Sequence, residues 1–248
     1  YQYLINTIDD ATGRIFCRFF ATDNTANNMT VLKAYIERFG RPLGFYTDFG
    51  VVFNLNQGEG RRLNRPPKTK RTKVQGDQTA GCEEVLTPRS ISHNEFKTQF
   101  SRALDELQCE LILAHSPQAK GRVERCFSTL QDRLVFALRF HGIKTIEAAN
   151  DFLENSFIAE FNRRFGREPN GSTDVHRPSD GFDLEAILSY QDERYVNNDY
   201  TFRIGSKKYQ ILVTSTDPCF SKKKVIVERR LNGRMAVRYN NKYCNYAL

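Results

Sequence analysis

Two carboxylates stand out in this sequence because of what surrounds them. Asp48 ends the apolar run "LGFYTD", and a strand of an α/β sheet would present it at the edge where ligands bind. Glu124 lies in "HSPQAKGRVER", where the cations Lys120, Arg122 and Arg125 surround it. Cations attract phosphate, whereas a carboxylate among them repels it unless a divalent cation bridges the two. The pattern therefore indicates a divalent cation, Mg²⁺ or Mn²⁺, and we expect two such ions at a displacement on phosphorus.

The segment before Glu124 has the composition of a phosphate-binding loop. His115, Ser116 and Gln118 follow the apolar run "CELILA", and an apolar helical pattern begins near Gly121. The N–H groups at a helix N-terminus bind phosphate oxygens, and acids in the first turn are stabilised there. A simpler explanation also exists for each carboxylate. Asp48 could be a turn former at the end of a strand, and Glu124 a solvated helical glutamate.

The composition narrows the class of partner. The 248 residues include 37 Lys+Arg against 29 Asp+Glu, a formal net charge of +8, which favours a polyanion such as nucleic acid. The six cysteines form no CxxC motif, so we expect no zinc site, a reduced cytoplasmic setting and mostly small core cysteines. No apolar run is long enough to span a membrane. The chain begins inside an apparent strand, so we expect a fragment of a longer protein.

Alternation and helical periodicity predict an α/β unit over residues 1–165. The strands "YQYLINTI" and "RIFCRFF" form a hairpin around "DDATG", and a helix follows at 26–39. A further helix and a buried strand precede residue 114, and two helices cover about 121–140 and 145–165. His141 and His176 fall in loops without partner spacing.

An insertion interrupts this unit at residues 54–95. It is rich in proline and glycine and contains seven cations between positions 61 and 73, which are Arg61, Arg62, Arg65, Lys68, Lys70, Arg71 and Lys73. A DNA-contacting arm and a solvated loop explain it equally well.

The C-terminal part changes character. Residues 166–190 read as a polar linker with a short helix, and 191–248 alternate apolar and polar residues between tight turns. This pattern predicts a small, basic, all-β (SH3-like) barrel of about five strands.

Four motifs carry a resemblance to a known family. In chain order, "IDDATGRI", "YTDFG", "SPQAKGRVER" and "TLQDRL" resemble the integrase-type catalytic core of bacterial insertion-sequence transposases of the DDE class, most of all the ISNCY-like group. The resemblance covers most of residues 3–165 and extends more weakly into the barrel through "ERYVNNDYTFRIGSKKYQIL". It implies an RNase H-like mixed sheet flanked by helices and three carboxylates that bind two metal ions. It also implies cleavage of double-stranded DNA at transposon ends, strand transfer by the freed 3′-OH, and a homodimer or larger assembly.

The same resemblance assigns the site residues. Asp48 matches the second acid and Glu124 the glutamate, while the first acid lies on a strand that precedes "YLINTI" in the family and is not in this sequence. Asp9 and Asp10 fall in the hairpin turn, which turn chemistry explains. Two other functions remain open: a catalytically inactive DNA-binding descendant, and a stand-alone RNase H-like nuclease.

Overall fold

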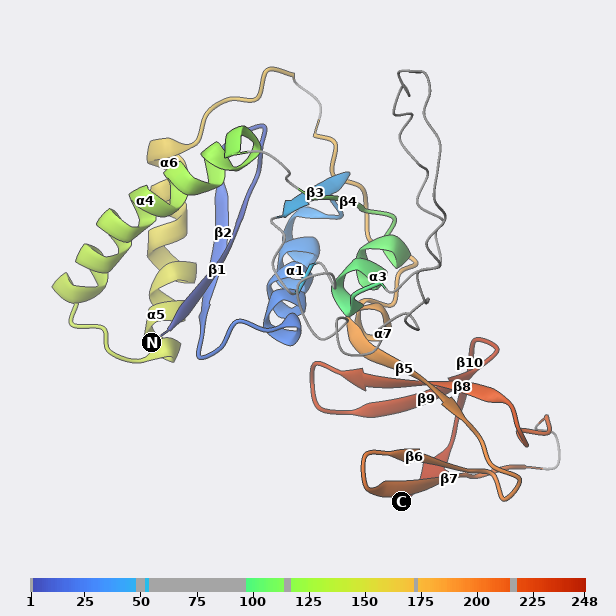
Figure 1. The fold of residues 1–248 in the computed structure, drawn as a ribbon. Coiled ribbons are helices and arrows are strands. Elements are labelled where there is room, and N and C mark those ends of the chain that lie inside the picture. Colours follow the sequence, from blue (N-terminus) through green and yellow to red (C-terminus); the bar gives the residue numbers. More distant parts are fainter. Residues whose placement is uncertain (1, 48–51, 54–96, 114–116, 172–173, 215–217) are drawn as a thin grey trace, which may run out of the picture.

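The chain folds into an α/β unit followed by a β unit, as the computed structural model shows (Figure 1). The structure describes residues 2–47, 52–53, 97–113, 117–171, 174–214 and 218–248. Among these residues, no helix is long and apolar enough to cross a membrane.

The N-terminal hairpin is confirmed. Strands β1 (Tyr3–Ile8) and β2 (Ile15–Phe20) pair antiparallel. Between them, the carboxylate of Asp9 accepts the backbone N–H groups of Ala11 and Thr12 at 3.3 and 3.2 Å. Asp9 therefore shapes the turn, as its position in "DDATG" predicts.

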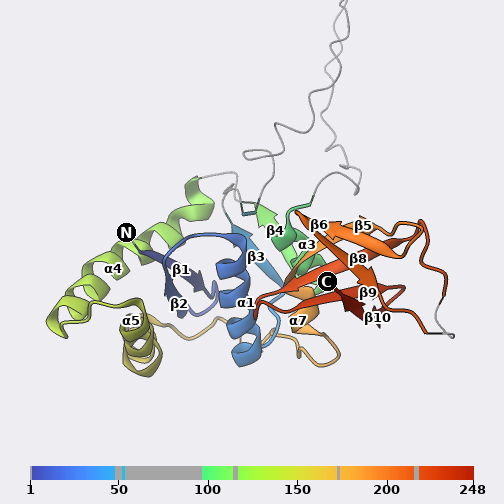
Figure 2. The same cartoon turned by 90° about the horizontal axis from the view of Figure 1, so that it is seen from below.

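The predicted first helix is also confirmed. Helix α1 (Thr25–Phe39) is capped by Asn24, whose side chain accepts from the Asn27 N–H at 2.9 Å. Its buried face packs against Phe16 of β2 and Phe45 of β3 (Gly44–Thr47) within one core cluster. Helix α1 lies between the β1–β2 pair and the β3 strand in both views (Figures 1 and 2).

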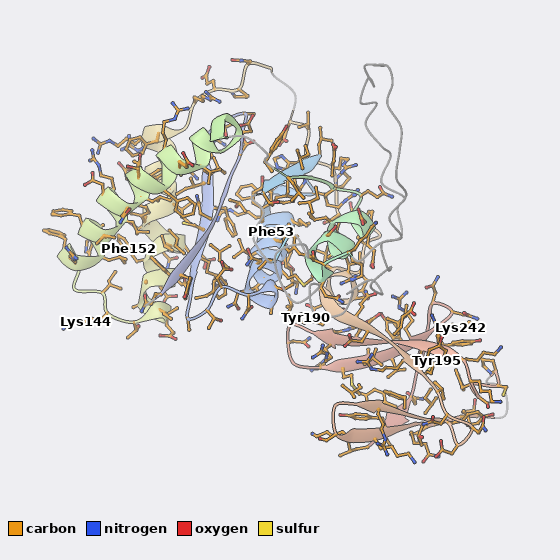
Figure 3. The ribbon with its side chains drawn as sticks, viewed as in Figure 1. Phe53, Lys144, Phe152, Tyr190, Tyr195 and Lys242 are labelled. Atoms are coloured by element: carbon orange, nitrogen blue, oxygen red, sulfur yellow. The ribbon has the colours of Figure 1, made fainter. Side chains whose placement is uncertain are left out.

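The expected single mixed sheet is not formed by the described residues. Strand β3 pairs parallel with β4 (Glu110–Leu113), and this pair is a separate sheet from β1–β2. Helix α3 (Gln99–Glu106) connects to β4 and buries Phe100 and Leu104. Phe53, which follows β3, packs on Phe100 with ring centroids 5.1 Å apart, beside α1 (Figure 3).

The long helix begins earlier than the sequence predicts. Helix α4 (Pro117–Phe140) includes the segment expected to be a loop, so Gly121 lies inside the helix and makes no tight turn. A Cβ at Gly121 would meet no atom within 4 Å, so no close approach requires this glycine. The proline at the first position suits a helix start, because its missing N–H has no intrahelical partner there.

The predicted helix at 145–165 contains a π-helical turn. It divides into α5 (Ile146–Phe152), η2 (Leu153–Phe157) and α6 (Ile158–Phe165). Asn150 and Asn162 would lie about 120° apart on an ideal α-helix. The extra residue in the wide turn removes roughly 100° of that difference, so both side chains reach the outer edge of β2.

These asparagines cap the strand edge with reciprocal bonds. Asn162 accepts from the Ile15 N–H at 2.7 Å and donates to the Ile15 carbonyl at 3.0 Å. Asn150 makes the same pair of bonds with Phe19 at 2.8 and 3.1 Å. Capping satisfies backbone groups that would otherwise leave an open sheet edge.

We expect Asn162→Ala to lower the free energy of unfolding by about 2–3 kcal/mol, because it removes two partly buried hydrogen bonds. Urea denaturation measures this change. Asn170→Ala, at an exposed asparagine of the linker, is the matched control and should change stability by less than about 0.5 kcal/mol. Equal effects of the two substitutions would rule out the capping role.

The linker after α6 is held against the first unit by two arginines. The backbone groups of Arg41 and Arg177 exchange hydrogen bonds of 2.8 Å in both directions. The buried side chain of Arg41 donates to the carbonyls of Leu107 at 2.5 Å and Pro178 at 2.9 Å. At Gly40, with φ +89°, a Cβ would stand 2.8 Å from the Arg177 carbonyl oxygen, so the close approach requires glycine.

The C-terminal unit has more strands than the sequence predicts. A short helix, α7 (Leu184–Ile187), leads into two sheets with orders β10-β9-β8-β5 and β11-β7-β6. The strands are β5 (Ser189–Tyr195), β6 (Thr201–Ile204), β7 (Lys207–Ile211), β8 (Lys224–Arg230), β9 (Met235–Tyr239), β10 (Lys242–Cys244) and β11 (Tyr246–Ala247). They enclose a core of Phe202, Ile211, Val225, Val227 and Val237.

The polar strand β5 joins the two units. The side-chain amide of Gln99 on α3 exchanges hydrogen bonds with the backbone of Gln191 at 2.9 and 3.0 Å. Arg102 donates to the carbonyls of Ile187 at 3.0 Å and Ser189 at 2.6 Å. Tyr190 lies where β5 leaves the first unit (Figure 3). Helix α3 thus provides the polar contacts that fix β5.

Candidate functional site

Glu124 is exposed and lies within α4, past the first turn of the helix. It is the eighth residue of the helix, about two turns from Pro117. The stabilisation by a helix N-terminus acts within the first turn, so it does not explain Glu124, contrary to the expectation from the sequence. Its side chain is exposed and has no partner within the part of the chain that the structure describes. The carboxylate is therefore accessible to a ligand.

The apolar stripe of α4 is buried along only part of its length. Leu130 and Leu134 are buried against Ile15 and Cys17 of β2. Val123 and Phe127, on the same side of the helix, remain 39% and 38% exposed. The first turns of α4 therefore extend past the sheet that its middle covers.

A hydrogen bond connects β1 to this part of α4. The side-chain amide of Asn6 donates to Sγ of Cys126 at 3.6 Å, while its Oδ1 is buried without a partner in the described regions. Oγ1 of Thr47, the last residue of β3, is likewise buried without a described partner. Unpaired buried polar atoms are rare and indicate a missing hydrogen-bond partner.

Strands β3 and β4 run parallel, so their carboxyl ends meet at one edge. Thr47 pairs with Leu113 at that edge. Asp48 follows Thr47 directly, and α4 begins four residues after Leu113. Asp48 itself lies outside the described residues.

The other predicted site residues divide into two groups. Gln118, Lys120, Arg122 and Arg125 belong to α4, and only Arg125 has a described side chain, which is exposed and donates to the Gly121 carbonyl at 3.0 Å. The remaining residues lie outside the described ranges: His115 and Ser116 before α4, and Arg61, Arg62, Lys68, Lys70 and Arg71 in the insertion. The structure therefore tests neither the insertion as a DNA contact nor the loop before α4.

No group of three His, Cys, Asp or Glu side chains that could hold a metal is found in the described ranges. Asp48 lies outside those ranges, so that finding does not test the predicted metal site of Asp48 and Glu124. The donor type fits the predicted ion, since Mg²⁺ and Mn²⁺ prefer carboxylate oxygens and Glu124 offers one that is exposed.

The cysteines differ in their environments. Cys17 and Cys109 are buried, as expected for small core residues, and burial raises the pKa of the Cys17 thiol to about 12. Cys219 is exposed, contrary to that expectation, and the Tyr200 hydroxyl beside it lowers the pKa of its thiol. Cys17, Cys109, Cys126 and Cys219 are free thiols.

The sequence indicates neither of two polar clusters in the structure. In the first, Nε2 of His176 is hydrogen-bonded to Tyr35 Oη at 2.8 Å, and Nδ1 of His176 to Asp174 Oδ1 at 2.7 Å. The position of His176 in the sequence suggested no partner. Burial, and then the charges of Asp9 and Asp174, raise the pKa of Tyr35 to about 12. The cluster joins α1 to the linker. No signal in the sequence joins residues 141 positions apart.

The second cluster centres on Glu228 of β8, whose side chain is fully buried. Its carboxylate accepts from Arg238 Nε at 2.9 Å, Arg230 Nη2 at 3.3 Å and the Tyr243 hydroxyl at 3.2 Å. In the sequence "KKVIVERR" this glutamate resembles any solvated strand residue.

Comparisons with known proteins identify relatives over most of the chain. It is 31% identical over 239 residues to a putative transposase, y4bF, of Sinorhizobium fredii, an alignment that covers 95% of this chain and 45% of the relative. It is 30% identical over 203 residues to the transposase for insertion sequence IS1202 of Streptococcus pneumoniae, covering 82% of this chain and 37% of that protein. The chain thus spans less than half the length of these curated relatives. No family model matches it.

Proposed function

We propose that this chain is part of a DNA transposase that cleaves transposon ends and joins the freed 3′-OH to target DNA. The observation that carries the proposal is the similarity to two proteins named transposases, at about 30% identity over most of this chain. The net charge of +8 agrees with a DNA partner. The joining of two ends implies a dimer or larger assembly.

The chemistry is of the DDE type. Asp48 and Glu124 would hold Mg²⁺ or Mn²⁺, and the ions would stabilise charge on the attacking and leaving oxygens. Three features support this pair: the position of Asp48 directly after Thr47 at the β3–β4 edge, the start of α4 close to that edge, and the exposed carboxylate of Glu124. No side chain needs to act as a nucleophile, since water or a 3′-OH attacks phosphorus.

Positively charged groups near Glu124 would hold the DNA backbone. Arg125 is exposed one position from Glu124, and Lys120 and Arg122 belong to the same helix. Arginine and lysine supply sequence-independent attraction to phosphates. This part of α4 would thus position the scissile phosphate beside the carboxylates.

The RNase H-like arrangement requires a further strand between β1 and β3, and we place it upstream of Tyr1. Three observations support it: the two separate two-stranded sheets, the unpaired buried atoms Asn6 Oδ1 and Thr47 Oγ1, and the exposure of Val123 and Phe127. An inserted strand would join the sheets, supply donors and cover these apolar side chains. By resemblance to the family, that strand carries the first acid.

Two experiments test the function. Sequencing the gene upstream of Tyr1 should reveal an aspartate within an apolar, β-branched run. The natural protein that contains this chain should then join transposon-end oligonucleotides to a target plasmid in Mg²⁺. Binding of the ends without cleavage or joining would instead favour a catalytically inactive DNA-binding descendant.

A further inference from the structure

The outer edge of β2 is capped at two positions and open at the position between them. Ile15 and Phe19 direct their backbone groups away from β1, toward Asn162 and Asn150. Successive residues of an antiparallel strand alternate in direction, so the N–H and C=O of Cys17 point to the same outer edge. Neither group has a partner in the described parts of the chain.

A cavity of about 290 Å³ lies at this open position. Cys17 and Asn150 line it, and α1 and α5 lie on opposite sides of β2 in both views (Figures 1 and 2). Its apolar lining comes from Phe16, Ala34 and Ile158. Its charged lining residues are Arg18, Glu37, Arg38 and Glu154, all of which are exposed. The lining is thus apolar within and charged at the mouth.

The two asparagines show which chemistry suits this edge. A carboxamide presents one N–H donor and one acceptor on the same carbon, and each asparagine uses both against one residue of β2. The Watson–Crick edge of every nucleobase presents the same adjacent donor and acceptor, and proteins read unpaired bases by it. The Cys17 backbone offers the complementary pair.

We propose that the cavity binds a single nucleobase, whose Watson–Crick edge exchanges two hydrogen bonds with the backbone of Cys17. The ring would lie between the apolar side chains of Phe16, Ala34 and Ile158. The carboxylates at the mouth can accept hydrogen bonds from sugar hydroxyls, and the arginines can bind a phosphate group. The volume is near the lower end of small-molecule pockets, roughly 300 Å³, so one nucleoside fits better than a larger ligand.

The base can come from a free nucleoside or from an unpaired position in DNA. Base-paired DNA is excluded because its Watson–Crick edges are already occupied. The proposal needs neither Asp48 nor Glu124, so it can fail or succeed independently of the proposed function.

Labelling with ¹⁵N-cysteine gives a direct readout, since the chain has six cysteines and the Cys17 signal is assigned with Cys17→Ser. Adenosine should shift the Cys17 amide resonance and slow its exchange with water, while the other cysteines change little. Ala34→Leu fills the cavity and should weaken binding at least about tenfold. Ala26→Leu, on the same helix outside the cavity lining, is the matched control and should bind as the wild type does.

Two DNA probes distinguish the sources of the base. If DNA supplies the base, a duplex with one unpaired 3′-terminal adenine should shift the Cys17 amide resonance, and the blunt duplex should not shift it. If Ala34→Leu does not fold, the exposed substitution Glu37→Arg at the cavity mouth replaces it, with the same expected loss. The proposal would be overturned if neither adenosine nor the unpaired base shifted the Cys17 amide resonance. It would also be overturned if Ala34→Leu bound as tightly as the wild type, or if blunt DNA shifted the Cys17 resonance as much as the duplex with the unpaired base.

Discussion

We expect Glu124→Gln to lower the rate of the proposed strand transfer by roughly a thousandfold, about 4 kcal/mol of transition-state stabilisation, and to leave DNA binding within about twofold. The substitution keeps the shape of the side chain and removes only the charge that would hold the metal. Glu124 is exposed and has no partner in the described structure, so the fold loses no contact. A gel assay of end joining in Mg²⁺, together with fluorescence anisotropy of DNA binding, measures both quantities.

Glu147→Gln is the matched control for this experiment. Glu147 is an exposed glutamate in the first turn of the neighbouring helix α5, outside the proposed site. Its loss should leave joining within about twofold of the wild type. Equal joining by the wild type and Glu124→Gln would remove Glu124 from the metal site, whatever the protein's function.

We expect Glu228→Ala to destabilise the protein by about 3 kcal/mol. The fully buried carboxylate accepts hydrogen bonds from Arg230, Arg238 and Tyr243, and the two guanidinium groups are themselves mostly buried. Removing one member of such a network leaves buried charges uncompensated, which costs more than the loss of the bonds alone. Thermal and urea denaturation, followed by circular dichroism, measure the change.

The same sheet provides a control for this prediction. Glu193 of β5 pairs with Lys224 at 2.8 Å, but both side chains are more than half exposed. Glu193→Ala should cost less than about 1 kcal/mol, because solvent screens exposed ion pairs. A cost for Glu228→Ala no greater than for Glu193→Ala would mean that the buried network does not stabilise the C-terminal unit.

The sequence predicts individual helices and strands better than it predicts which of them contact one another. The hairpin, α1, β3, α3 and α4 could be placed because each carries a local signal, such as the "DDATG" turn or the helical spacing of Leu130 and Leu134. Helix α4 starts early because proline is a good first residue, which the glycine-based prediction overlooked. Strand β5, "SYQDERY", escaped because its polar residues contact the first unit instead of alternating with a core.

Long-range contacts have no local signal at all. Asn162 contacts Ile15 across 147 positions, and the π-helical turn that aligns it is invisible in the apolar spacing. For the candidate site, the sequence indicates the residue types, and the structure adds the common edge of β3 and β4 and the exposure of Glu124. The pairing of Asp48 with Glu124 remains a prediction from the motifs.

The most direct test of the central claim is the binding of Mn²⁺ to the natural protein, measured by electron paramagnetic resonance in the absence of DNA. We expect Asp48→Asn and Glu124→Gln each to weaken binding at least about tenfold, because both carboxylates would hold the ion. Glu147→Gln should bind as the wild type does. Unchanged Mn²⁺ affinity in both Asp48→Asn and Glu124→Gln would contradict the account.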